Sequence, residues 1–195
     1  MSLHRMLLAR AAEANPLRIG VIGAGKFGSM YLSQIPTTPG IHLLGIADLS
    51  PDRARENLAR LGWKPDVTSA TSFEDARKHG STHLTDDWRA LVSHPEIDII
   101  VESTGDPIAA VEHALEAFRH GKSVVMVTVE ADAFCGPLLA KRAAAAGVIY
   151  SLAYGDQPAL ICELVDWART SGFEVTAAGR GHKWLPHFAQ STPET

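Results

Sequence analysis

A glycine-rich turn between an apolar run and a helical pattern constrains the fold of this chain more than any other feature. Residues 17–22 are mostly apolar, and glycines follow at positions 23, 25 and 28. This G-x-G-x-x-G spacing is typical of dinucleotide-binding units. We expect Gly23 to allow the tight turn, Gly25 to admit a pyrophosphate, and Gly28 to let the helix approach the strand. The alternative is a glycine-rich turn that binds nothing.

The two residues between the second and third glycines, Lys26 and Phe27, belong to the same predicted site. They begin the helix whose N–H groups and positive dipole end would face the pyrophosphate. Phe27, Met30, Tyr31 and Ile35 recur at helical spacing and predict one buried face.

A carboxylate stands where a dinucleotide site needs one. Residues 41–47 predict a second buried strand, and Asp48 follows at the spacing of the side chain that binds the adenosine ribose. Alternatively, Asp48 has no role beyond opening a loop, because Ser50 and Pro51 resemble an N-cap and a first-turn proline. A carboxylate favours NAD, whereas Arg53 could hold the 2′-phosphate of NADP. The cofactor is therefore predicted as NAD or NADP.

Composition excludes several other classes of function. The net charge is −4, so no basic field recruits nucleic acid. Two cysteines, Cys135 and Cys162, are typical of reduced thiols in a cytoplasmic protein. No apolar run reaches the length of a membrane span. Two histidines five residues apart, His182 and His187, are poor grounds for a metal site, and no metal is expected.

Strand-like and helical segments then alternate. Residues 97–101, 123–127 and 148–152 predict buried strands, separated by helices near 107–120 and 137–146. Such alternation predicts an α/β fold with a Rossmann-type, doubly wound parallel sheet. Residues 63–97 are expected to form an irregular insertion at the adenine side or the sheet edge. We predict three regions, namely an N-terminal helix over 1–16, an NAD(P)-binding domain over 17–155, and a third region over 156–195.

Two turns should border the nicotinamide half of the cofactor, because ligands bind beyond the carboxyl ends of parallel strands. Ser103, Thr104 and Gly105 follow one strand and are expected to contact the nicotinamide side through backbone and hydroxyl groups. Glu130 follows the next strand; it either positions substrate or nicotinamide, or only stabilises a helix N-terminus. Lys122 lies at the opposite end of that strand and is interpreted as a surface charge.

The third region is predicted to be a connecting helix and the first strand of a second, α+β domain. Residues 173–178 alternate apolar and polar, as a strand with one wet face does. Beyond it lie Arg180, His182 and Lys183. Lys183 or His182 could polarise a carbonyl, and Arg180 could bind a phosphate or carboxylate of the substrate; a solvated loop is the alternative. A lone edge strand suggests a truncated substrate or dimerisation domain.

The chain resembles the nucleotide-binding domain of homoserine dehydrogenase-type oxidoreductases over roughly residues 17–155. The more specific motifs are Glu-x-Thr-Gly-Asp-Pro at 102–107 and Gly-Lys-x-Val-Val at 121–125. The Asn-Lys pair of that family is replaced here by Val129 and Glu130, so its lysine is absent. Residues 127–132 and 179–186 are more similar to a branch with a C-terminal SAF-type domain, which includes 1-deoxy-D-xylulose 5-phosphate reductoisomerase-like enzymes and implies NADPH.

The residues and the resemblance together predict an NAD(P)-dependent oxidoreductase. It would transfer hydride between the nicotinamide and a small polar carbonyl or alcohol, and would form a homo-oligomer through the missing domain. Alternatives are a phosphorylated-ketose reductoisomerase and a non-catalytic, dinucleotide-binding regulatory module. The 195 residues alone are expected to be inactive.

Overall fold

The computed structural model describes residues 2–155, 157–179, 185–190 and 192. The chain divides into two compact units, Met1–Ala153 and Tyr154–Thr195. The first unit contains the sheet and seven α-helices, and the second contains helix α8 (Gln157–Thr170) and a short 3-10 segment, η3 (Pro186–Gln190). No helix among these residues is long and apolar enough to cross a membrane.

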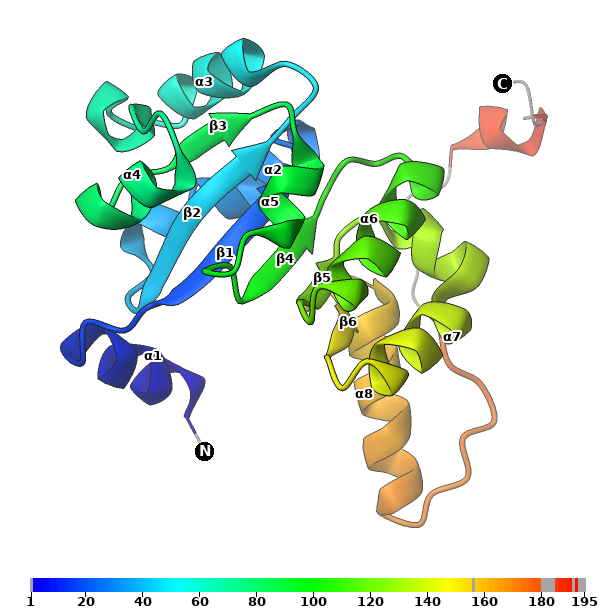
Figure 1. The fold of residues 1–195 in the computed structure, drawn as a ribbon. Coiled ribbons are helices and arrows are strands. Elements are labelled where there is room, and N and C mark those ends of the chain that lie inside the picture. Colours follow the sequence, from blue (N-terminus) through cyan, green and yellow to red (C-terminus); the bar gives the residue numbers. More distant parts are fainter. Residues whose placement is uncertain (1, 156, 180–184, 191, 193–195) are drawn as a thin grey trace. The chain divides into compact units, whose positions relative to one another are not determined.

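The first unit is built on a six-stranded, fully parallel sheet in the order β3-β2-β1-β4-β5-β6 (Figure 1). The order reverses between β1 and β4, which creates a crevice beyond the carboxyl ends of these strands. The predicted Rossmann-type sheet is confirmed. The strands are β1 (Leu17–Ile22), β2 (Ile41–Ala47), β3 (His83–Thr85), β4 (Ile99–Glu102), β5 (Ser123–Met126) and β6 (Tyr150–Leu152).

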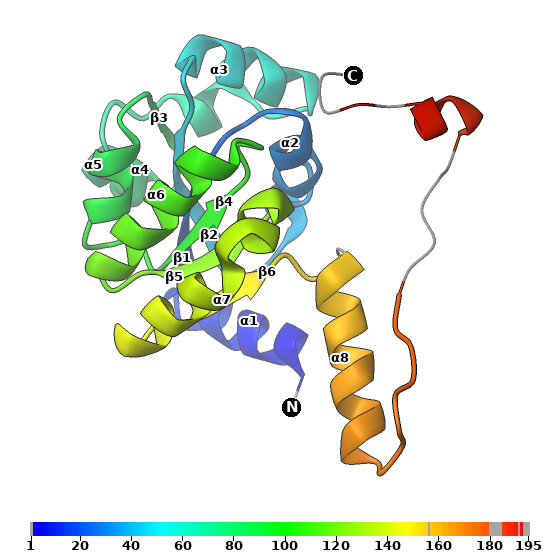
Figure 2. The same ribbon diagram turned by 90° about the vertical axis from the view of Figure 1, so that its right-hand side faces the viewer.

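Helices cover both faces of this sheet (Figures 1 and 2). One buried cluster packs α2 and α3 on one face, and a second packs α4 to α7 on the other. The central strands are apolar in nearly every position because both of their faces are buried. The helices are α1 (Leu3–Ala12), α2 (Lys26–Leu32), α3 (Pro51–Arg60), α4 (Phe73–His79), α5 (Trp88–Ser93), α6 (Pro107–Arg119) and α7 (Val129–Ala145).

Local capping explains where several helices begin. The Ser50 hydroxyl accepts the Arg53 N–H at the start of α3, so the predicted N-cap is present. Asp106 accepts the N–H groups of Ile108 and Ala109 at the start of α6, with Pro107 as first helical residue. These caps fix the turns that follow β2 and β4, and both turns border the crevice.

The structure contains one strand that was not predicted and lacks one that was. Within 63–97, residues 83–85 form β3, which pairs with β2 at the sheet edge. Three residues are too few to show a strand pattern in the sequence. By contrast, residues 173–178 form no strand. A strand needs a neighbour for its backbone hydrogen bonds, whereas here Phe173 stacks on Trp167 of α8 with ring centroids 6.4 Å apart.

Two predictions of exposure were also wrong. Lys122 is 7% exposed, and its Nζ donates to the Ile97 carbonyl at 2.6 Å. Burial lowers the pKa of this ammonium group. Phe27 and Met30 do not form a buried face, because both are more than half exposed and α2 ends at Leu32.

Candidate functional site

Two of the three glycines in the loop after β1 are required by packing. Gly23 has φ +91°, and a Cβ there would lie 2.8 Å from the Ser103 carbonyl oxygen. A Cβ on Gly28 would lie 2.5 Å from the Gly23 carbonyl oxygen. The loop therefore folds against itself and against the turn after β4 more closely than any side chain permits.

Gly25 is different, because no atom beyond those of its two chain neighbours lies within 4 Å of where its Cβ would be. Its φ is −75°, a value that any residue adopts, so neither strain nor packing demands glycine. Lys26 and Phe27 follow as exposed residues of the first turn of α2. First-turn N–H groups have no partner within their own helix. The open space beside them suits a phosphate group.

Asp48 ties the end of β2 to the glycine loop. Its Oδ2 accepts the Ala24 N–H at 2.9 Å, and its Oδ1 accepts the Ser50 N–H at 3.0 Å. The loop-opening role is therefore real. Each carboxylate oxygen has a further lone pair, so the same side chain retains the capacity to accept a ribose hydroxyl.

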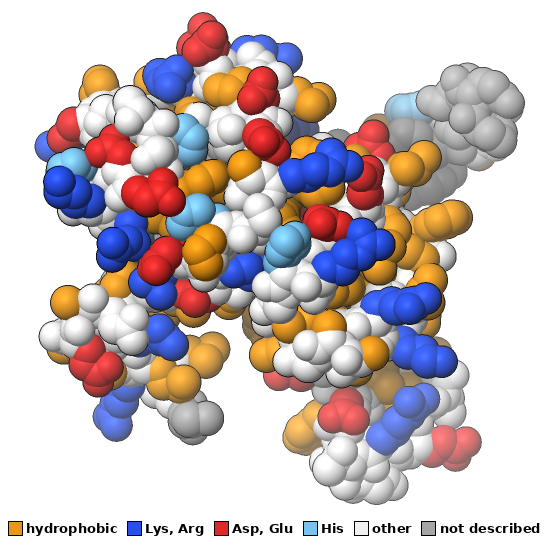
Figure 3. Space-filling model, viewed as in Figure 1, with side chains coloured by type: hydrophobic (Ala, Val, Ile, Leu, Met, Phe, Trp, Pro, Cys, Tyr) orange, Lys and Arg blue, Asp and Glu red, His pale blue; other side chains and the backbone are white. Residues whose placement is uncertain are grey.

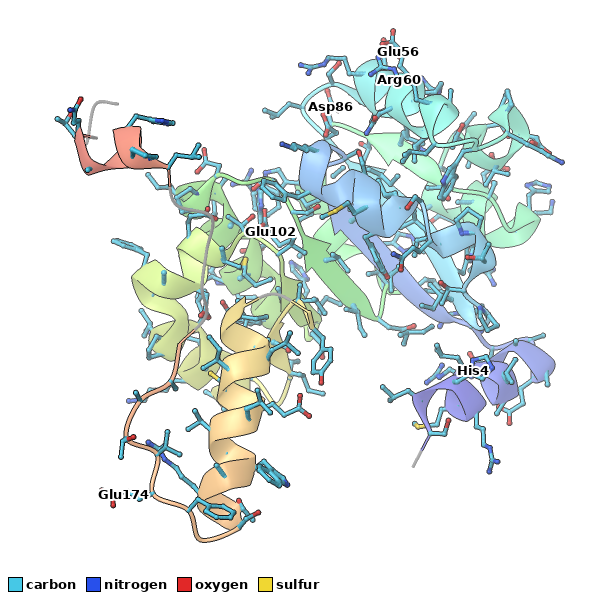
Figure 4. The ribbon with its side chains drawn as sticks, turned by 180° about the vertical axis from the view of Figure 1, so that it is seen from behind. His4, Glu56, Arg60, Asp86, Glu102 and Glu174 are labelled. Atoms are coloured by element: carbon cyan, nitrogen blue, oxygen red, sulfur yellow. The ribbon has the colours of Figure 1, made fainter. Side chains whose placement is uncertain are left out.

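A cavity of about 350 Å³ lies between the start of α2, the end of β2 and α3. It is lined by four of the predicted cofactor residues, Gly25, Lys26, Asp48 and Arg53. Glu56 and Arg60 on α3 also line it and form an ion pair at 3.6 Å (Figure 4). The cavity therefore combines one carboxylate at the strand end with cations suited to a phosphate.

Asn57 is a member of this site that sequence reasoning missed. Its Nδ2 donates to the Ala24 carbonyl at 2.7 Å and to the Ser29 hydroxyl at 2.6 Å. Asn57 thus holds the glycine loop from α3. Its position one turn after Arg53, on the same helix face, was the available signal.

The turn after β4 contacts the glycine loop directly. The Ser103 hydroxyl is buried and donates to the Gly23 carbonyl at 2.7 Å. This hydroxyl therefore stabilises the loop, and the predicted contact between Ser103 and the cofactor stays a prediction. Thr104 and Gly105 are exposed residues at the tip of the turn.

Glu102, which precedes this turn, is completely buried at the end of β4 (Figure 4). Its Oε1 accepts the Thr104 hydroxyl at 2.6 Å and lies 3.2 Å from His113 Nδ1. Its Oε2 accepts the Thr128 hydroxyl. Sequence reasoning included Glu102 only as the first residue of the Glu-x-Thr-Gly-Asp-Pro motif and did not connect it with His113, because their contact depends on how α6 packs on β4.

The predicted catalytic residues are placed only in part. Glu130 is exposed in the first turn of α7, directly after β5 and Thr128. Arg180, His182 and Lys183 lie outside the described residues, so their roles stay predictions. On the face drawn in Figure 3, basic and acidic side chains are interspersed.

Fold and site together define an NAD(P)-binding Rossmann domain of an oxidoreductase. The family model described as the NAD binding domain of homoserine dehydrogenase matches residues 23–152, about two thirds of the chain. The chain belongs to this family, and its cofactor is NAD(P). A second family model, described as the catalytic domain of oxidoreductase DRL, matches residues 155–195.

Curated relatives match through part of their length. A homoserine dehydrogenase of Methylobacillus glycogenes is 30% identical over 115 residues, which cover 56% of this chain and 24% of the relative. An inositol 2-dehydrogenase/D-chiro-inositol 3-dehydrogenase of Lactiplantibacillus plantarum is 26% identical over 112 residues, covering 57% and 27%. The chain thus spans about a quarter of the length of these relatives.

Solved structures show the same fold. An NAD binding oxidoreductase from Klebsiella pneumoniae has a TM-score of 0.53 at 21% identity, covering 80% of this chain and 39% of that one. A homoserine dehydrogenase from Thiobacillus denitrificans has a TM-score of 0.51 at 23% identity, covering 70% and 29%.

Proposed function

We propose that Met1–Ala153 binds NAD(P) across the crevice and presents its nicotinamide to a small polar substrate. The pyrophosphate would lie at Gly25 and the start of α2, and the adenosine ribose at Asp48. The nicotinamide would lie at Thr104 and Gly105 beyond β4. One observation carries this proposal: Gly25 borders open space within a loop whose other two glycines are required by packing.

The proposed reaction is hydride transfer between the nicotinamide and a carbonyl or alcohol carbon. On oxidation, the alcohol carbon gives its hydride to the nicotinamide and its hydroxyl loses a proton to a base; reduction is the reverse. Glu130 would position the substrate or the nicotinamide from the start of α7. Lys183 or His182 would polarise the carbonyl, and Arg180 would bind an anionic substrate group.

A second candidate is a reductoisomerase-like enzyme that rearranges a phosphorylated ketose before reducing it. The match of residues 155–195 to the catalytic domain of oxidoreductase DRL favours a substrate domain different from that of homoserine dehydrogenase. The loss of the family lysine, replaced here at Val129 and Glu130, points the same way. A phosphate on the substrate would give Arg180 and Lys183 a common anionic partner.

Titration with NADH and NADPH tests the cofactor proposal on this chain. We expect saturable binding of at least one of them, detected by nicotinamide fluorescence. The absence of binding to either cofactor would refute the proposal. Turnover, homo-oligomerisation and cytoplasmic location stay predictions. A screen of amino-acid alcohols, polyols and phosphorylated ketoses for hydride transfer would separate the two candidate reactions.

A further inference from the structure

Glu102 is a buried acid that the proposed chemistry does not explain. Its side chain is 0% exposed at the carboxyl end of β4, beside the point where the strand order reverses. An ionised carboxylate in such a place is strongly unfavourable unless its oxygens are hydrogen-bonded. An apolar residue would fill the same space without that cost, so the contacts of the carboxylate need an explanation.

The partners of Glu102 come from three separate elements. Thr104 belongs to the turn after β4, His113 to α6, and Thr128 to the turn after β5. The Thr104 hydroxyl and N–H both donate to Oε1, at 2.6 and 3.3 Å, and the Thr128 hydroxyl donates to Oε2. We call these four residues, Glu102, Thr104, His113 and Thr128, the carboxylate network.

The carboxylate network sets the backbone of both turns that follow β4 and β5. Thr128 Oγ1 also accepts the Gly105 N–H at 3.0 Å, so one hydroxyl joins Glu102 to the tip of the other turn. Thr104 Oγ1 likewise accepts the Asp106 N–H at 3.3 Å. His113 is buried, and its ring packs on Trp88 with centroids 4.5 Å apart.

We propose that Glu102 is a positioning residue for the nicotinamide half of the cofactor. It acts through Thr104 and Thr128, whose hydroxyls orient the turns that the nicotinamide meets, and it does not touch the cofactor. The turn after β4 contacts the glycine loop through Ser103, which is not a member of the network, so we expect the adenosine and pyrophosphate half to respond less to a change of Glu102. This inference rests on the proposed binding of NAD(P) across the crevice.

The test compares two probes on the 195-residue chain. NAD(P)H reports binding of the whole cofactor, whereas ADP-ribose lacks the nicotinamide and reports the other half. For Glu102→Gln we expect affinity for NAD(P)H to fall roughly tenfold, as for the loss of a charged hydrogen-bonding group. Affinity for ADP-ribose should change by less than about twofold. Glu116→Gln is the matched control, because Glu116 lies on α6 and pairs with Arg119.

A second pair of variants covers the case in which Glu102→Gln does not fold. Thr128→Val removes the bridging hydroxyl at nearly constant volume, and Thr128→Ser keeps it. We expect Thr128→Val to weaken NAD(P)H selectively and Thr128→Ser to restore binding close to that of the unaltered chain.

The outcomes distinguish a role of Glu102 in positioning the nicotinamide half from a role in stabilising the fold alone. A selective loss of NAD(P)H affinity with rescue by serine supports the proposal. Equal losses for both probes would show that the carboxylate network only stabilises the fold, and unchanged affinities would show that it does neither. If the unaltered chain binds ADP-ribose as tightly as NAD(P)H, the nicotinamide makes no contact and the inference fails. If it binds neither probe, the proposed function itself fails.

Discussion

The two sides of the crevice are held by different physical means. The glycine loop after β1 keeps its shape because backbone atoms pack where no Cβ fits, at Gly23 and Gly28. The turn after β4 keeps its shape because hydroxyls and an imidazole contact the buried carboxylate of Glu102. The first device is close backbone packing, within the loop and against Ser103, whereas the second is a set of polar contacts to one buried side chain. The cofactor half that each side would bind should therefore respond to different substitutions.

The largest expected effect is on the backbone fit of the glycine loop. Gly23→Val adds a Cβ 2.8 Å from the Ser103 carbonyl oxygen at φ +91°. We expect the free energy of unfolding to fall by about 2 to 5 kcal/mol, from left-handed strain plus overpacking. Urea denaturation measures it. Gly62→Val is the control, because Gly62 has φ +87° but no atom beyond its chain neighbours lies within 4 Å of its Cβ position. An equal loss of stability in this control would show that overpacking at Gly23 contributes nothing.

Gly25→Leu should separate binding from stability. Because no protein atom meets a Cβ at this position, the free energy of unfolding should change by less than about 1 kcal/mol. Affinity for NAD(P)H should fall at least about 100-fold, since the side chain fills the space assigned to the pyrophosphate. Fluorescence titration and urea denaturation of the same sample give both values. Unchanged affinity would contradict the assignment of this loop.

On the other side of the crevice, removing a member of the carboxylate network should lower the free energy of unfolding. His113→Leu leaves Glu102 Oε1 without its imidazole partner, and we expect a loss of about 1 to 3 kcal/mol in the free energy of unfolding. His113→Asn, which retains a side-chain N–H donor, should lose less. If the leucine variant were as stable as the unaltered chain, the imidazole would contribute nothing to holding the carboxylate.

The smallest expected effect concerns the choice between the two nicotinamide cofactors. Asp48→Ala should weaken NAD more than NADP by about fivefold, because a ribose diol loses an acceptor while a 2′-phosphate loses a repelling charge. Comparing the two dissociation constants measures this. Asp52→Ala is the control, since Asp52 is exposed in the first turn of α3 and does not line the cofactor cavity. Equal losses for both cofactors would place the carboxylate away from the ribose.

Much of the fold follows from local pattern. Continuous apolar runs predicted β1, β2, β4, β5 and β6, and capping residues such as Ser50 and Asp106 predicted where helices begin. Local pattern did not predict the short segments correctly. The three residues of β3 are a strand only because β2 offers them a partner. Residues 173–178 have the alternation of a strand but lie beside α8 without a ladder.

The site divides along the same line. By itself the sequence determined the Rossmann-type fold and the cofactor loop, because Gly23, Gly25, Gly28 and Asp48 stand at a recognisable spacing along the chain. Only the tertiary structure distinguished the glycines that packing requires from Gly25, which borders open space. It alone revealed the contacts of Glu102 with His113 and Thr128, and the buried Lys122. Such contacts arise where separate strands and helices converge, and no local spacing encodes that convergence.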